Sequence, residues 1–215
     1  TDKIIRPILR GRDIKRYNYK WADLYLIATF PSLNYDIEEY PAIKNHLLSY
    51  GIERLLQTGE TYIINGEKIN ARKKTNNRWF ETQDCINYMD DFNRQKIVYR
   101  EISTQMNACM IPDSYVINNK LYMIIGDHLE YLLAFLNSKI FNKIYLNTVN
   151  ITGGKGADFL LNIKLSKPTI DIENRLFYIF KTTNLDKREE IIDNLFYEMY
   201  NLDEEEIEWI KAYKL

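Results

Sequence analysis

The sequence is poor in the residues that most often build metal sites and disulfides. Its 215 residues include only two cysteines and two histidines. Cys85 and Cys109 have no CxxC spacing, and His46 and His128 lie far apart in the chain, so these four residues cannot form a four-ligand zinc site. Two cysteines without a disulfide pattern are typical of a protein from a reducing cytoplasm.

Long hydrophobic runs are also lacking. The longest, such as LYMIIG at residues 121–126, are far too short to cross a bilayer, and no basic leader followed by an apolar stretch is present. We therefore expect no membrane segment. The sequence starts without Met and inside a basic motif, which suggests a piece of a longer polypeptide.

Motifs of nucleotide-binding and hydrolytic enzymes are missing as well: GxGxxG, GxxxxGK[ST], HExxH and GxSxG do not occur. Two weaker candidates remain. The glycine-rich stretch 153–156 (GGKG), with Lys155, either cradles a phosphate through backbone amides or is a turn after a helix. Asp13 and Lys15 have the Asp-x-Lys spacing of metal-dependent nucleases, but one such tripeptide arises easily by chance in a sequence that is 27% charged.

The net charge of −1 conceals an uneven distribution. Residues 1–169 hold 23 Lys and Arg against 18 Asp and Glu, whereas the last 46 residues hold 6 against 12. We therefore predict a basic domain over residues 1–168 and an acidic extension over residues 169–215.

The basic residues form two clusters, and these clusters are more informative than the net charge of the chain. Residues 1–20 hold seven Lys and Arg against two Asp, and residues 68–80 hold five with no acid. Aromatic residues such as Tyr17 and Trp79 are interleaved with them. Each cluster alone is either a solvated surface or a contact with phosphates, and two together favour a polyanion partner.

Hydrophobic periodicity outlines the elements. YLIATF at 25–30 predicts a buried strand, and apolar residues at three- and four-residue steps predict one helix from Pro41 to Gly59. The polar, basic run 66–79 predicts an exposed loop.

The second half predicts strands over residues 96–102 and 114–125, the latter folded into a hairpin at Asn118-Asn119. An apolar stripe then predicts a long helix over 129–147. Helices are also expected over 187–200 and from the acidic run 203–206 to residue 212. The expected fold class is α+β: a mixed or mainly antiparallel sheet flanked by two long amphipathic helices, with a helical C-terminal extension.

Four stretches, in this order, resemble the TaqI-like C-terminal specificity domain of adenine-specific DNA methyltransferases and fused type II restriction-modification enzymes. They are IIRPILRGRDIKRY at 4–17, KIVYREIS at 96–103, LLAFLNSKIFNKIY at 132–145 and IIDNLFYEMYNLDEEEI at 191–207. The last has Asn201 where that family usually has Gly.

The resemblance implies a target recognition domain that reads duplex DNA and is non-catalytic by itself. In that family a separate N-terminal domain binds S-adenosylmethionine and methylates a flipped adenine through an Asn-Pro-Pro-Tyr motif, which this sequence lacks. The implied partners are double-stranded DNA and an N-terminal methyltransferase domain of the same polypeptide. Fused members also carry an endonuclease activity, for which magnesium is the expected cofactor.

Ten residues are the candidates for DNA binding. Arg12, Lys15 and Arg16 contact phosphate or build the framework of the domain. Lys73, Lys74 and Arg78 lie on the irregular loop, with Arg78 the candidate for a base contact. The remaining four are Thr104, Gln105 and Asn107, which either read an adenine or form a simple turn, and Lys155 as a phosphate contact.

Two other functions stay open at this point. One is an interaction module whose acidic helical end docks a protein, with incidental basic loops. The other is a nuclease that uses Asp13 and Lys15.

Overall fold

The computed structural model describes residues 3–101, 105–148 and 160–212, and it divides the chain into two compact units. Unit 1 contains residues 1–7 and 25–90, and unit 2 contains residues 8–24 and 91–215. The first strand, β1 (Ile5–Leu9), runs from one unit into the other. The boundary that charge predicts at residue 168 stays a prediction, and the compact units divide the chain at other positions.

Unit 1 is built from short elements around a small core. β4 (Tyr25–Ile27) pairs antiparallel with residues 5–7 of β1, and β5 (Thr61–Ile64) forms a hairpin with β6 (Glu67–Asn70). The helical elements are η2 (Pro31–Leu33), η3 (Ile37–Glu39), α1 (Pro41–Leu48) and α2 (Ile52–Leu55). Its buried core consists of Ile4, Ile37, Ile43 and Phe80.

Unit 2 contains the larger sheet. β7 (Lys96–Arg100) lies in the centre, with β8 (Ala108–Ile111) and β10 (Leu121–Ile124) antiparallel on its two sides. β9 (Val116–Ile117) runs parallel to residues 8–9 of β1. After η1 (Gly11–Asp13), β2 (Ile14–Lys15) and β3 (Asn18–Tyr19) form a small hairpin, and η4 (Met89–Asn93) precedes β7.

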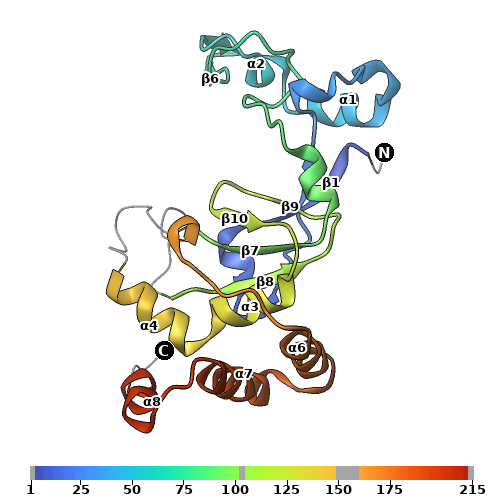
Figure 1. Cartoon of the computed structure of the whole chain (residues 1–215). Helices are drawn as coiled ribbons and strands as arrows, with labels where there is room; N and C mark the ends of the chain where they lie inside the picture. Colours follow the sequence, from blue (N-terminus) through green and yellow to red (C-terminus); the bar gives the residue numbers. More distant parts are fainter. Residues whose placement is uncertain (1–2, 102–104, 149–159, 213–215) are drawn as a thin grey trace. The chain divides into compact units, whose positions relative to one another are not determined.

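Helices form further layers on this sheet (Figure 1). α3 (Leu129–Asn137) contacts β7 and β8, and α6 (Ile170–Thr182) packs against α3. α4 (Lys139–Thr148) contacts both α7 (Leu185–Met199) and α8 (Glu204–Lys211). One buried cluster, which includes Ile97, Phe141 and Phe196, joins sheet and helices. The C-terminal helices are therefore packed into the same unit as the sheet, and the predicted α+β class is confirmed.

Both long helices expected from periodicity are interrupted, so those two predictions are wrong in detail. Gly51, at φ +88°, separates α1 from α2. Ser138, at ψ 156°, separates α3 from α4, and its Oγ accepts a hydrogen bond from the Phe141 N–H as a helix cap. Apolar spacing does not reveal the second break because α3 and α4 contribute to the same buried cluster, through residues such as Phe135 and Phe141.

The hairpin expected at Asn118-Asn119 is also wrong. A turn is present, because the Leu121 N–H donates to the Asn118 carbonyl. The two strands that flank it, however, pair with different partners, β9 with β1 and β10 with β7. The local signal for a turn is correct, but strand pairing depends on distant segments.

Several elements were not expected from the sequence, among them β8, the hairpins β2–β3 and β5–β6, and α6. The hairpin β5–β6 replaces the first part of the expected loop, and Asn65-Gly66 at its turn is a strong hairpin signal. α6 begins after Pro168 with Thr169, whose Oγ1 accepts from the Ile172 N–H. That helix-capping threonine is the signal that could have revealed it.

Candidate nucleic-acid interface

The opening motif LRGRD is a self-closed turn. The Arg10 guanidinium donates to both carboxylate oxygens of Asp13, at 3.0 and 2.8 Å, and the Arg10 N–H donates to Asp13 as well. Asp13 is buried, and its hydrogen bond with Arg10 lowers the pKa of the Asp13 carboxyl. With both oxygens engaged by Arg10, the geometry does not favour Asp13 as a metal ligand of a nuclease.

Between these two residues the backbone passes close to the turn that precedes β10. A Cβ added to Gly11 would lie 3.3 Å from the Lys120 carbonyl oxygen and Cβ, so the small residue allows the approach. Arg12 follows on the exposed side of η1. Lys15 is also exposed, while its neighbour Ile14 is buried and accepts a hydrogen bond from Arg100 at 2.6 Å. Arg12 and Lys15 are therefore two solvent-exposed cations on a backbone that hydrogen bonds hold in place.

Arg16 is placed differently. Its side chain is only 15% exposed, donates to the Asn137 carbonyl at the end of α3 and forms an ion pair with Glu189 of α7 at 3.3 Å. The next residue, Tyr17, donates its backbone N–H to the Ala108 carbonyl, and its ring centre lies 5.9 Å from that of Phe180 with the two rings tilted by 60°. Of the two roles predicted for Arg16, this geometry favours the framework, because the guanidinium ties the opening motif to the helices.

The loop with Lys73 and Lys74 in unit 1 is irregular but internally ordered. Arg72 points inward and donates to three backbone carbonyls, those of Leu55, Trp79 and Glu81. Burial lowers the pKa of the Arg72 guanidinium. Lys73 and Lys74, which follow it, are exposed, and within the described residues their ammonium groups make no hydrogen bond.

A buried glutamine completes the support of this loop. Gln57 donates from Nε2 to the carbonyls of Arg78 and Glu81 and accepts from the Thr75 hydroxyl at 2.7 Å. All the polar groups of its amide that point into the loop are therefore used. We call residues 71–82, held by Arg72 and Gln57, the basic loop.

Arg78 is engaged within the basic loop. Its guanidinium donates to the buried Glu81 carboxylate at 2.7 and 2.8 Å and to the Asn34 side chain, and it lies 4.8 Å from the Phe80 ring centre. The Glu81 carboxylate also accepts from the Arg78 N–H. The side chain is 43% exposed, so one side of it faces solvent. Its predicted base contact stays a prediction.

The polar segment before β8 lies beside the opening motif in unit 2. Gln105 and Asn107 are half-buried, and the Asn107 amide donates to the Gln105 carbonyl at 3.3 Å. The bond from Tyr17 to Ala108 brings the β2–β3 hairpin next to this segment. Thr104 and Lys155 lie outside the described residues.

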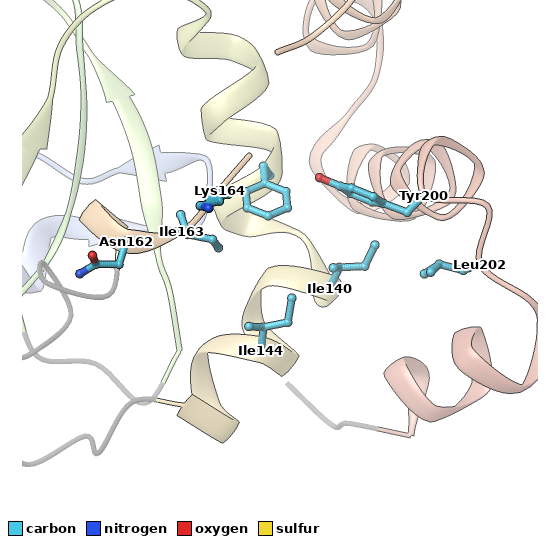
Figure 2. Close-up of a pocket in the computed structure, with 8 residues that line it drawn as sticks. Ile140, Ile144, Asn162, Ile163, Lys164, Tyr200 and Leu202 are labelled. Atoms are coloured by element: carbon cyan, nitrogen blue, oxygen red, sulfur yellow. The ribbon is translucent and has the colours of Figure 1, made fainter. Parts of the chain in front are cut away.

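Unit 2 also has an apolar pocket of about 640 Å³ (Figure 2). Ile140 and Ile144 of α4 line it together with Tyr200 and Leu202, which follow α7. Burial raises the pKa of Tyr200, so its hydroxyl stays protonated at neutral pH. Among the residues that the structure describes, its lining includes no carboxylate, histidine or thiol and none of the predicted DNA-binding residues.

The sequence comparison decides the family. The family model of the TaqI-like C-terminal specificity domain matches residues 6–167. The chain belongs to this family. A search of curated protein sequences gives no match.

A solved structure has the same fold as this specificity domain. It is the type IIL restriction-modification enzyme MmeI in complex with DNA, with a TM-score of 0.54 and 12% sequence identity. The match covers 98% of this chain and 31% of the MmeI chain, so the specificity domain spans about a third of that enzyme.

The LNSK motif, residues 136–139, connects the end of α3 and the start of α4 to β8 and to α7. Asn137 is fully buried, accepts from the Ala108 N–H and donates to the Ala108 carbonyl, so it continues the β8 ladder like a neighbouring strand. Asn142 accepts from the Met106 N–H at 2.8 Å. The Lys139 N–H donates to buried Asp193 of α7, whose pKa is raised by burial.

Sequence reasoning missed the residues that hold the candidate interface. Gln57 and Glu81 gave no signal, because single polar residues acquire a role only when the fold buries them. In the described part of the chain, no three His, Cys, Asp or Glu side chains gather as a metal site, and no helix is long and apolar enough to cross a membrane.

Proposed function

We propose that this specificity domain recognises a duplex DNA sequence for a restriction-modification enzyme and is itself non-catalytic. The observation that carries the proposal is the basic loop, which holds Lys73 and Lys74 outward on a buried polar support. Because the backbone of the loop is already ordered, only the lysine side chains lose freedom when they neutralise phosphates. Family membership and the DNA complex of the similar MmeI structure support the same function.

The candidate residues form two groups, one proposed to contact phosphates and the other proposed to contact bases. Lys73, Lys74, Arg12 and Lys15 contact phosphates and fix the register of the domain on the duplex. Gln105 and Asn107 carry side-chain amides, which pair with the N6 and N7 groups of adenine in the major groove. Thr104, Arg78 and Lys155 remain candidates for DNA contact.

The chemistry is proposed to reside in another part of the parent polypeptide. An adenine-specific methyltransferase domain, N-terminal to this chain, would bind S-adenosylmethionine and take the target adenine out of the helix. Unstacking a base costs a few kcal/mol, and phosphate contacts made by the specificity domain would hold the distorted duplex during the reaction. If the parent also cleaves DNA, its endonuclease part would use magnesium.

A salt series tests DNA binding directly. Anisotropy of a labelled random duplex with the whole chain is expected to give an affinity that falls steeply with salt, and Lys73→Ala with Lys74→Ala should reduce the logarithmic slope by about 2. Lys187→Ala, an exposed lysine on the acidic α7, is the matched control. Absence of binding, or a flat slope for the unchanged chain, would remove the proposal.

Protein docking is a second candidate function, favoured by one observation. On α6 the side chains of Ile170, Phe177 and Tyr178 are 60–78% exposed, although each is large and apolar or aromatic. Such side chains on one helix favour a protein contact, for which the methyltransferase domain is our candidate. Weakened association of Phe177→Ala with that separately expressed domain would support it, and unchanged association would remove it.

A further inference from the structure

The β5–β6 hairpin of unit 1 has one face that packs on nothing in that unit and carries an unusual mixture of side chains. Its turn is Asn65-Gly66, with φ of +50° and +82°, the left-handed pair that a two-residue hairpin turn requires. Four-residue strands on either side make a ribbon roughly 13 Å long.

The strand register sorts the side chains of the hairpin onto two faces. Thr61 lies opposite Asn70 and Ile63 lies opposite Lys68, so these four side chains share one face. All four are exposed, and Ile63 is 79% exposed. The other face carries half-buried Tyr62, Ile64 and Ile69, together with Glu67.

The base of the hairpin is continuous with the basic loop. The ladder extends beyond β6 through hydrogen bonds from Ala71 N–H to the Glu60 carbonyl and from Gly59 N–H to the Arg72 carbonyl, both 2.9 Å. Arg72 is in turn fixed by its three carbonyl partners. Arg72 therefore holds both the base of the hairpin and the backbone that leads to Lys73 and Lys74.

We propose that this hairpin enters the major groove of the target duplex and that Ile63 contacts a thymine methyl group, a role that rests on the proposed function. A two-stranded ribbon fits the groove, which is about 12 Å wide and 8.5 Å deep, and a ribbon roughly 13 Å long reaches its floor. Lys73 and Lys74 at the base would then meet the flanking phosphates. Ile63 and Lys68, nearer the turn, would meet the base edges.

The chemistry of the exposed face favours DNA over a protein partner. An apolar side chain, a cation, an amide and a hydroxyl are the groups that contact thymine methyls, guanine and adenine in the major groove. The face carries no carboxylate, because Glu67 is paired with Ile64 on the other side. The Thr61 hydroxyl donates to the Asn70 side chain at 2.9 Å, which orients that amide.

Ile63 allows a test that reads a single methyl group. Binding-site selection with the whole chain first gives the preferred sequence, and each thymine in it is then replaced by uracil, which lacks the methyl. One replacement should weaken the unchanged chain roughly fourfold and leave Ile63→Ala unaffected. Ile63→Thr, which keeps the β-branched shape for the strand and one γ-methyl group, should show a uracil effect between those of the unchanged chain and Ile63→Ala. Random-duplex affinity and salt slope should not change.

One control variant and three contrary results separate a failure of the hairpin inference from a failure of the proposed function. The control is Phe177→Ala, which removes a different exposed hydrophobic side chain and should retain the full uracil effect. If Ile63→Ala keeps both the selected sequence and the uracil effect, the hairpin inference is wrong while DNA recognition stands. If Ile63→Ala weakens all duplexes equally, Ile63 contributes no base contact and the inference is again wrong. If the unchanged chain shows no salt-dependent binding, the proposed function itself is wrong.

Discussion

Replacement of Arg78 by alanine separates a structural role from a base contact at the centre of the basic loop. Without the guanidinium, the buried Glu81 carboxylate loses the hydrogen bond from Arg78 Nε and the ion pair with Arg78 Nη2, and it keeps the hydrogen bond from the Arg78 N–H. Removing one partner of a fully buried ion pair costs about 3–5 kcal/mol. Because the Arg78 side chain is 43% exposed and water can reach the carboxylate, we expect about 2 kcal/mol.

Amide hydrogen exchange measures the loss of stability in the basic loop itself. A loss of about 2 kcal/mol in local stability should accelerate amide exchange in residues 71–85 roughly 30-fold, if the loop opens as a unit. The amides of Thr75 and Thr82, which bond to Gln57 and Thr29, report this opening. Peptides from unit 2 should exchange at the unchanged rate and serve as the internal reference.

Arg54→Ala is the matched control, because Arg54 is an exposed arginine on α2 in the same unit. It should leave exchange in residues 71–85 unchanged. The structural account of Arg78 would be refuted if Arg78→Ala kept the exchange rates of the loop and altered only the selected DNA sequence. That result would establish the base contact predicted from the sequence.

Three further predictions concern unit 2. Asn137→Ala leaves two buried backbone groups of β8 without partners and should lower the free energy of unfolding by about 3 kcal/mol in a urea titration, whereas Asn194→Ala on the surface of α7 should have little effect. Asp13 has a lowered pKa in the fold, so its stabilising contribution is present at neutral pH and is lost as the pH falls below about 4. Asp13→Asn should therefore show a smaller loss of stability than the unchanged chain between pH 5 and the acid transition, and an equal loss would contradict the assignment. Arg12→Ala with Lys15→Ala should reduce the salt slope of DNA binding without changing the urea midpoint, and a lowered midpoint would show that these residues belong to the framework.

The candidate site illustrates the limit of charge patterns. Seven basic residues within the two clusters are not distinguished by the sequence, yet Arg10, Arg16 and Arg72 are directed at carboxylate or carbonyl partners inside the protein. Lys15, Lys73 and Lys74 face solvent. Arg78 shares a feature with each group, because its side chain is 43% exposed to solvent and is also paired with Glu81. A sequence shows that a cation is present, but its partner is decided by residues that are distant in the chain.

The α+β class, the resemblance to the family and the approximate position of several helices could be predicted from the sequence alone, because they depend on local periodicity and on ordered motifs along the chain. Strand pairing, the breaks in the long helices and the internal cations of the opening motif became visible only in the folded chain. Glu189, for example, lies far from Arg16 in sequence and becomes its partner only when α7 packs in unit 2. Burial and pairing are properties of the folded chain as a whole, so Arg16 connects the opening motif to the helices, whereas Arg12 in the same motif is exposed.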